Sequence, residues 1–241
     1  MKYVALGMVS ITFLTALLPC PARAQVGHPP GGSPYREIFR GHSVTGFAGY
    51  IGGSGAELGI GPHTGPVYGI RYDIRTASAL QLGIQLAQAD LERFIVDPFV
   101  QVANRVSGPV NQRVSFVEAD LQLNLTGGKT WRRLAPFVGA GVGFSFAGDT
   151  PADTSGYEFG NKVYFVPYAG LRLFVTERFH FRGDARIPFW KLNYPASFTE
   201  EPPLEPGDPD GDSNAVIDDG PLSEWTTAPW FQLGLAYSFS F

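Results

Sequence analysis

Carboxylates recur at alternate positions between residues 208 and 219, and they are the side chains in this sequence best suited to hold a metal ion. The candidate oxygen ligands are Asp208, Asp210, Asp212, Asn214 and Asp219. Carboxylate and amide oxygens are the ligands that calcium prefers, and alternate acids open the helix-loop-helix calcium loop. The match is partial, because Gly211 comes too early for the sharp turn and Asp stands where a bidentate Glu is usual. The sequence leaves two interpretations open, a weak calcium site and a solvated acidic loop, and it predicts no other cofactor.

A second group that could do chemistry is His180, which would share one strand face with Arg182 and Asp184. A histidine beside a carboxylate can move protons as a general acid or base. No serine lies at a spacing typical of a nucleophile, and the His-x-Ser signature of one lipid A deacylase is absent. His180 is also expected near the periplasmic end of its strand, where lipid A is absent. We therefore predict that the protein is not an enzyme.

Glycines at 139, 141 and 143 resemble at first sight the glycine loop that binds a dinucleotide. They alternate with larger apolar residues inside one expected strand, and no helix follows to bind a phosphate. The pattern favours small inward residues that leave room for large neighbours such as arginines.

Strands must position all of these groups, because apolar and polar side chains alternate with a period of two in eight segments. We place the segments near Val44–Gly53, Pro66–Ile74, Leu80–Leu91, Val114–Leu125, Ala135–Ala147, Lys162–Val175, Phe179–Leu192 and Trp230–Phe241. Each has about the 9 to 11 residues with which a tilted strand crosses a bilayer. The last segment alternates strictly and the sequence stops on an aromatic residue, so Tyr237, Phe239 and Phe241 are expected on the lipid face of a closing strand.

The opposite faces of these strands carry ions of both signs. The predicted inward charges are Arg71, Asp73, Arg75, Glu118, Asp120, Arg172, Arg182, Asp184 and Arg186. Buried ions that lack a partner cost several kcal/mol, so nearly equal numbers of both signs are expected to pair. The sequence therefore predicts a salt-bridged lumen, and the alternative is a gated ion path in which some pairs rearrange.

The connections between the segments alternate in length. Short links are expected at 75–78, 126–130 and 176–178, whereas longer ones are expected at 54–63, 92–113, 148–161 and 193–227. Outer-membrane barrels alternate short periplasmic turns with long extracellular loops in this way. A soluble sandwich gives no reason for such regularity.

The amino-terminal residues have the pattern of a secretory signal peptide. Lys2 precedes an apolar stretch from Val4 to Leu18, and small residues follow up to Ala24. We expect a signal peptide over 1–24, a periplasmic tail over 25–42 and one barrel domain over 43–241. Cys20 is a candidate lipid acceptor, but Pro19 before it fits that role poorly. Cleavage after Ala24 would remove the one cysteine of the chain.

Three stretches and the terminal residue carry a family resemblance. They are Ala135–Phe144, Pro167–Phe174, Arg182–Arg186 and Phe241. With the eight alternating segments, the chain resembles the eight-stranded OmpA/OmpX-type outer-membrane barrels, in a form without a carboxy-terminal periplasmic domain. The resemblance implies an all-β, antiparallel up-and-down transmembrane barrel in the outer membrane of a Gram-negative-type bacterium. It also implies contact with outer-membrane lipid, lipopolysaccharide and the barrel-assembly machinery, which would read Tyr237, Phe239 and Phe241 as part of a carboxy-terminal sorting strand.

The function expected from these observations is a non-enzymatic barrel with a closed lumen that contributes to envelope integrity or contacts a surface or host ligand through its loops. A net charge of -4 makes nucleic acid an unfavourable partner. One alternative is a barrel that takes up small hydrophobic molecules, because Phe137, Tyr164, Val166, Tyr168 and Phe174 are expected inside. Another is a secreted, lipocalin-like carrier, although a band of outward aromatic residues argues against it.

Overall fold

The computed structural model describes residues 32–148, 150–151, 153–207 and 211–240. The chain divides into two units, Met1–Ser33 and Pro34–Phe241, and the second holds all the elements below. The expected signal peptide over 1–24 and the terminal Phe241 lie outside the described residues. Within the described part, no helix is long and apolar enough to cross a membrane.

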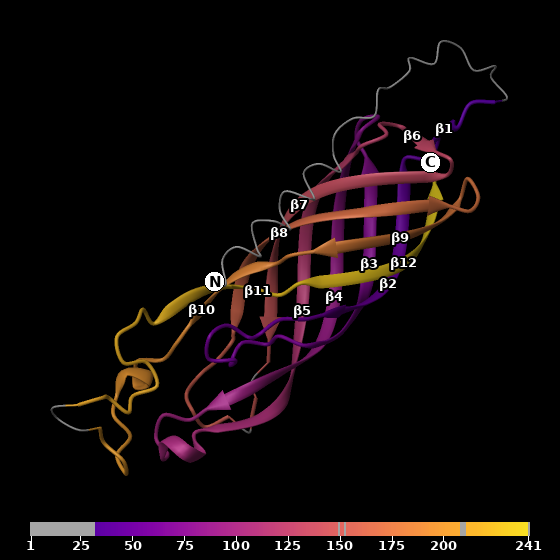
Figure 1. The fold of residues 1–241 in the computed structure, drawn as a ribbon. Coiled ribbons are helices and arrows are strands. Elements are labelled where there is room, and N and C mark those ends of the chain that lie inside the picture. The colour runs from indigo at the N-terminus through magenta and orange to yellow at the C-terminus, as the bar shows by residue number, and fades with distance from the viewer. Residues whose placement is uncertain (1–31, 149, 152, 208–210, 241) are drawn as a thin grey trace, which may run out of the picture. The chain divides into compact units, whose positions relative to one another are not determined.

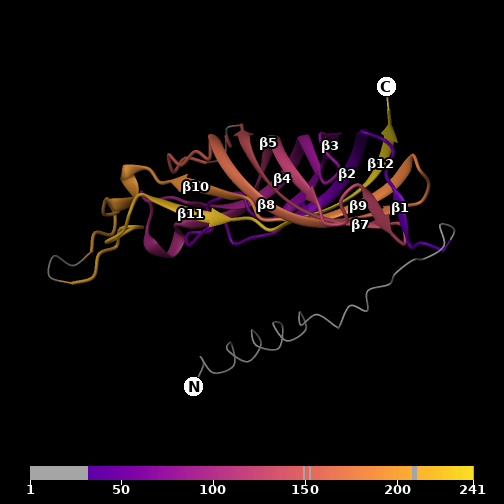
Figure 2. The same cartoon turned by 90° about the horizontal axis from the view of Figure 1, so that it is seen from above.

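Eight antiparallel strands of the described chain form a closed ring (Figures 1 and 2). They are β2 (His42–Ile51), β3 (Gly65–Arg75), β4 (Leu80–Val96), β5 (Val106–Asn124), β7 (Leu134–Ala147), β8 (Asn161–Phe174), β9 (Phe179–Arg186) and β12 (Trp230–Phe239). Each strand pairs with the next along the chain, and β12 closes the ring on β2 from His42 opposite Phe239 to Ile51 opposite Trp230. The eight-stranded up-and-down barrel is confirmed.

The outer face of the ring is apolar all the way round. Side chains alternate between buried and exposed along the strands, as a period of two requires. Among the outward residues, Leu233 is 75% exposed, Phe231 62% and Ile70 57%. A continuous apolar wall of this kind is stable in lipid and far exceeds the apolar patches of soluble proteins. This surface contradicts the lipocalin-like alternative.

The β4–β5 hairpin is longer than the sequence suggested. A loop was expected over 92–113, but β4 continues to Val96 and β5 begins at Val106, with the short 3-10 turn η1 (Val102–Asn104) between them. The pairing shifts register between Arg93 and Ile95. Such an irregularity breaks the alternation that marks a strand, which explains why the extension was missed.

Prolines interrupt two neighbouring stretches of strand at opposite points, one between β9 and β10 and the other between β11 and β12. The segment expected as one strand over 179–192 is split into β9 and β10 (Phe189–Asn193), and β11 (Ser223–Thr227) pairs with β10 before β12 begins. Pro188 and Pro229 lie in the two breaks. Proline has no N–H to donate to a ladder, so the regular pairing stops there. The β10–β11 hairpin and the short η2 (Ala196–Thr199) belong to the long-loop end.

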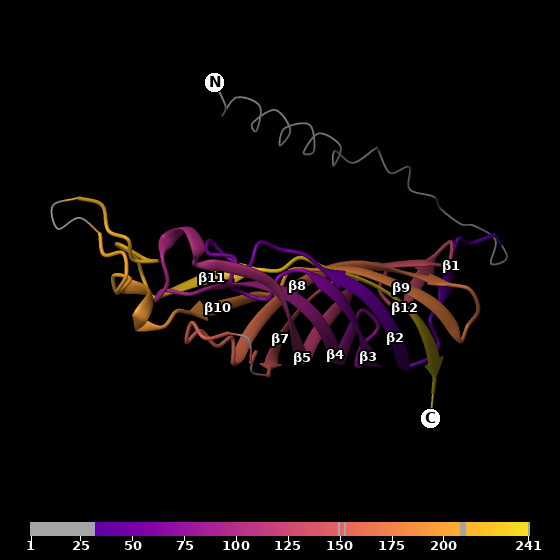
Figure 3. The same cartoon turned by 90° about the horizontal axis from the view of Figure 1, so that it is seen from below.

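The opposite, short-turn end carries a small extra sheet. β1 (Tyr35–Glu37) pairs with β6 (Lys129–Trp131), which belongs to the connection between β5 and β7. Figure 1 shows β1 and β6 at the other end of the barrel from β10 and β11, and Figure 3 shows the same separation for β1. Part of the stretch expected as a tail over 25–42 is thus a paired strand, and His42 already belongs to β2.

Candidate functional site

Arg71 on β3 is the centre of the ionic network inside the barrel. Its Nη1 and Nη2 each lie 2.6 Å from an oxygen of Asp120 on β5, and its Nε donates to Asp73 Oδ1 at 2.9 Å. None of the three side chains is more than 3% exposed. The bidentate geometry makes this a strong ion pair, which joins β3 to β5 over Gly83 of the intervening β4.

Arg186 on β9 forms a second centre. It pairs with Glu118 on β5, and its Nη1 lies 2.9 Å from Asp184 Oδ2. Gln232 on β12 donates to Asp184 Oδ1 at 3.0 Å and to Gln85 Oε1 at 3.1 Å. The carboxylates are therefore saturated by arginines and amides from strands all around the ring.

Two tyrosines of β8 extend the network. The hydroxyl of Tyr164 donates to Glu118 Oε2 at 3.2 Å, and the hydroxyl of Tyr168 donates to Asp120. Both residues were expected among the inward aromatics, and both are buried. Their hydroxyls make this stretch polar, whereas an uptake barrel would need an apolar cavity here.

The remaining two arginines, towards the short-turn end, have mainly amide partners. Arg172 donates to Gln81 Oε1 at 3.0 Å and to Asn124 Oδ1 at 2.7 Å. Arg182 donates to Gln122 Oε1 at 2.8 Å and lies 4.3 Å from the centre of the Phe137 ring. Its nitrogens are 3.5 Å from Asp184 and 3.8 Å from Asp73. We call the four arginines and four carboxylates the lumen network: Arg71, Arg172, Arg182, Arg186, Asp73, Glu118, Asp120 and Asp184.

Aromatic residues fill the lumen at the long-loop end. Phe116 lies in the middle, with its ring centre 5.5 Å from Trp230, 5.8 Å from Tyr164 and 6.4 Å from Trp190. All four are at most 2% exposed. Phe116, Trp190 and Trp230 are not among the inward residues expected from the sequence, although each stands at an inward position of its strand.

Glycines make room for these large residues. A Cβ at Gly143 or Gly139 would collide with the ring of Tyr164 or Tyr168, and a Cβ at Gly83 would collide with the Arg71 guanidinium. The inward glycines of β7 were expected to leave room for large neighbours such as arginines. At Gly139 and Gly143 those large neighbours are tyrosine rings, because β8 pairs directly with β7.

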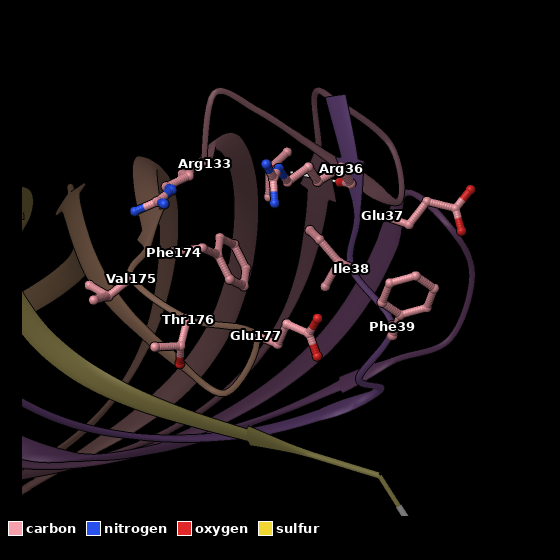
Figure 4. Close-up of a pocket in the computed structure, with 10 residues that line it drawn as sticks. Arg36, Glu37, Ile38, Phe39, Arg133, Phe174, Val175, Thr176 and Glu177 are labelled. Atoms are coloured by element: carbon pink, nitrogen blue, oxygen red, sulfur yellow. Dashed lines mark hydrogen bonds between the residues drawn. The ribbon is translucent and has the colours of Figure 1, made fainter. Parts of the chain in front are cut away.

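Arg75 was predicted to join the lumen network, and this was wrong. It lies at the end of β3, where the inward direction leads to the rim, and it donates to the backbone oxygens of Ile38 and Phe39. It thereby holds the segment after β1 beside the short turns. This segment lines a cleft of about 190 Å³. Figure 4 shows Ile38 and Phe39 on one side of it, with Phe174 and Glu177 facing them.

His180 meets a serine that the sequence spacing did not reveal. Ser238 Oγ lies 3.3 Å from His180 Nδ1, because β12 pairs with β9. The His180 ring stacks on Phe174 with centres 4.6 Å apart. His180 and Ser238 are only 2% and 4% exposed, so a substrate has no access to the pair.

The predicted calcium ligands are only partly described. Asp208 and Asp210 lie outside the described residues. Of the others, Asn214 donates its backbone N–H to Glu201 Oε2 at 3.1 Å. Among the described residues, no three acidic, histidine or cysteine side chains come together in a way that could hold a metal. Calcium binding stays a prediction, as does the role of Tyr237, Phe239 and Phe241 in sorting.

No protein-family model and no curated protein matches the sequence. The solved structure of Neisserial surface protein A is similar over 82% of this chain and 97% of that one, with 11% identity and a TM-score of 0.52. OprG of Pseudomonas aeruginosa matches over 87% and 100%, with 14% identity and a TM-score of 0.48. Ail of Yersinia pestis matches over 83% and 99%, with 13% identity and a TM-score of 0.39. The first of these shows the same fold, a closed eight-stranded antiparallel barrel.

Proposed function

We propose that this chain, an eight-stranded barrel of the OmpA/OmpX type, is a closed outer-membrane wall protein that supports envelope integrity or surface contacts through its long loops. The observation that carries the proposal is the lumen network. Its ion-paired side chains are at most 3% exposed and come from β3, β5 and β9. A lumen filled by ion-paired side chains stiffens the barrel wall and leaves no path for ions to pass.

The size of the ring supports this proposal. Eight strands enclose an interior just wide enough for side chains to fill. Ion flow would require the Arg71–Asp120 and Arg186–Glu118 pairs to separate, and breaking a buried pair costs about 3–5 kcal/mol. A stable open state would need new partners for all four ions.

The loop lengths and charges at the two ends of the barrel support one orientation of the barrel in the membrane. Long-loop residues of the described chain include a series of acids from Glu200 to Glu224, whereas the short turns carry Arg132, Arg133 and Arg178. In outer-membrane barrels the longer loops face the exterior. We therefore place the acidic loops outside, beside lipopolysaccharide, and expect the assembly machinery to read the end of β12.

Planar-bilayer recording of the refolded protein tests the closed lumen. We expect no sizeable stable openings from the natural chain. A variant with Arg186→Ala and Glu118→Ala removes two of the largest plugging groups, and it should conduct more than the natural chain if it folds. Folding is checked by the mobility difference between unheated and heated samples on a gel. Frequent stable openings of the natural chain would contradict the proposal.

We also propose that the protein is not an enzyme, because the one histidine–serine pair described in the lumen is buried. Incubation with lipid A followed by mass spectrometry should show no lost or gained acyl chain. Uptake of a hydrophobic probe is the alternative function. The tyrosine hydroxyls bonded to Glu118 and Asp120 disfavour it, since an apolar guest would meet polar groups at mid-lumen.

A further inference from the structure

The loop between β7 and β8 folds over the β4–β5 hairpin and encloses a polar cleft of about 310 Å³ at the long-loop end. The lining side chains that matter below are Arg93, Gln112, Thr150, Asp153, Tyr157 and Phe159. Arg93 and Gln112 come from the two strands of the hairpin, and the others come from the loop. The cleft is separate from the lumen network and from the predicted calcium loop.

The walls of the cleft are held in place by contacts of their own. Arg93 Nη2 lies 2.6 Å from Asp153 Oδ2, and their side chains are 1% and 3% exposed. The Arg93 guanidinium also lies 5.4 Å from the centre of the Tyr157 ring. Burial opposes ionisation of Asp153, but hydrogen bonds from Ser155 and the Arg93 guanidinium outweigh it and hold the pKa of Asp153 below its usual range. A site held this way needs little reorganisation to bind a ligand.

Four polar atoms that line this cleft lack a hydrogen-bond partner among the described residues. They are Arg93 Nε, Gln112 Oε1, Thr150 Oγ1 and Tyr157 Oη. Arg93, Gln112 and Tyr157 are 1%, 4% and 3% exposed, and Gln112 Nε2 donates to Gly148 O at 3.0 Å, which fixes its amide. Buried polar groups are nearly always satisfied by protein or by ordered water, so four such groups around one cleft mark a place that holds water or a polar ligand.

The identity of the four atoms restricts that molecule. Arg93 Nε can only donate and Gln112 Oε1 can only accept, whereas the hydroxyls of Tyr157 and Thr150 can do both. A simple anion could not donate to Gln112, and a metal cation could not accept from Arg93. The charge of Arg93 is already matched by Asp153. A ligand that displaces water and satisfies all four atoms is therefore neutral overall and carries several groups that both donate and accept, as hydroxyls do.

We infer that this cleft binds one neutral sugar unit. About 310 Å³ is at the small end of the range of roughly 300–1,000 Å³ for small-molecule sites, which suits a single pyranose. Phe159 and the Tyr157 ring supply apolar surface beside the polar atoms. The inference rests on the proposed function only for the direction in which the cleft faces. The sugar could be free or part of the core of lipopolysaccharide.

Saturation-transfer NMR on the full barrel in detergent tests binding, with millimolar methyl glycosides of glucose, galactose and N-acetylglucosamine as probes. We expect transfer from at least one glycoside. Tyr157→Phe, which removes one hydroxyl and keeps the ring, should weaken binding about fivefold, as should Gln112→Met. The matched control is Tyr194→Phe, because the Tyr194 ring lies 6.4 Å from Tyr157 but does not line the cleft.

A second arm compares vesicles of lipid A with vesicles of lipopolysaccharide that carries its core sugars. Binding of the core-bearing vesicles alone, reduced by Tyr157→Phe, identifies the membrane glycan as the source and supports the inference. No glycoside transfer together with equal binding of both vesicles overturns it, as does equal loss in Tyr157→Phe and Tyr194→Phe. The gel-mobility check shows in every case whether the barrel is folded, so failure of this inference is distinct from failure of the proposed function.

Discussion

Removing the Arg71 side chain should destabilise the barrel more than any surface substitution. Arg71→Met leaves Asp120 with only the Tyr168 hydroxyl and leaves Asp73 with Arg182 at 3.8 Å. A buried carboxylate that loses its ion partner costs about 3–5 kcal/mol of unfolding free energy. The double variant Arg71→Met with Asp120→Leu removes both partners, so no buried Asp120 carboxylate is left without an ion partner. We therefore expect the double variant to lose about 2 kcal/mol less than the sum of the two single variants.

Urea unfolding in lipid bilayers measures these differences, with tryptophan fluorescence as the signal because Trp190 and Trp230 are buried at one end of the lumen. The control is Arg113→Met, which breaks an ion pair of 2.8 Å to Asp90 whose side chains are 66% and 40% exposed. Exposed pairs contribute about 0–1 kcal/mol, so the control should change little. A loss below about 1 kcal/mol for Arg71→Met, or strict additivity in the double variant, would refute the reasoning.

Gly83→Ala should cost about 1–3 kcal/mol in the same unfolding assay, because the new methyl group would collide with the pinned Arg71 guanidinium; Gly46→Ala, with open space around it, should be neutral. The lowered pKa of Asp153 means that its stabilisation of the β7–β8 loop is complete above about pH 4 and is lost as the pH falls further. The protection of residues 153–160 against hydrogen exchange, corrected for the intrinsic pH dependence of exchange, should therefore fall in acid, and Asp153→Asn should remove this change. Arg75→Ala should speed hydrogen exchange in the segment after β1 without changing the gel mobility of the barrel; unchanged exchange would show that the rim contact does not hold that segment.

Much of the wall could be predicted from local alternation. The period of two assigns each residue to a face without any knowledge of its partners, so Arg71 and Asp73 on one strand, and Arg182, Asp184 and Arg186 on another, were placed inside correctly. Whether a residue stands at an odd or an even position of its strand does not tell how far along the barrel axis its side chain lies. Arg75 has the parity of Arg71, yet it lies at the rim and bonds to backbone.

The partners inside the lumen could not be predicted in the same way. Asp120 follows Arg71 by 49 positions, and Arg186 follows Glu118 by 68, so which ions meet depends on strand stagger and ring size. The cleft at the long-loop end was missed for a related reason. Arg93 stands beside a register shift, and its partner Asp153 lies in a loop with no periodic signal.

The seam between β2 and β12 has a consequence for how the barrel assembles. An open sheet keeps β5 and β9 apart across its width, because β7 and β8 lie between them, so Arg186 and Glu118 cannot reach one another until the sheet curls. A partly curled sheet that entered the membrane would carry bare ions into hydrocarbon, at a cost of several kcal/mol each. Curling, neutralisation of the interior and closure of the seam should therefore occur as one cooperative event. The same ion pairs that fill the closed barrel therefore keep partly folded intermediates from being populated within the bilayer.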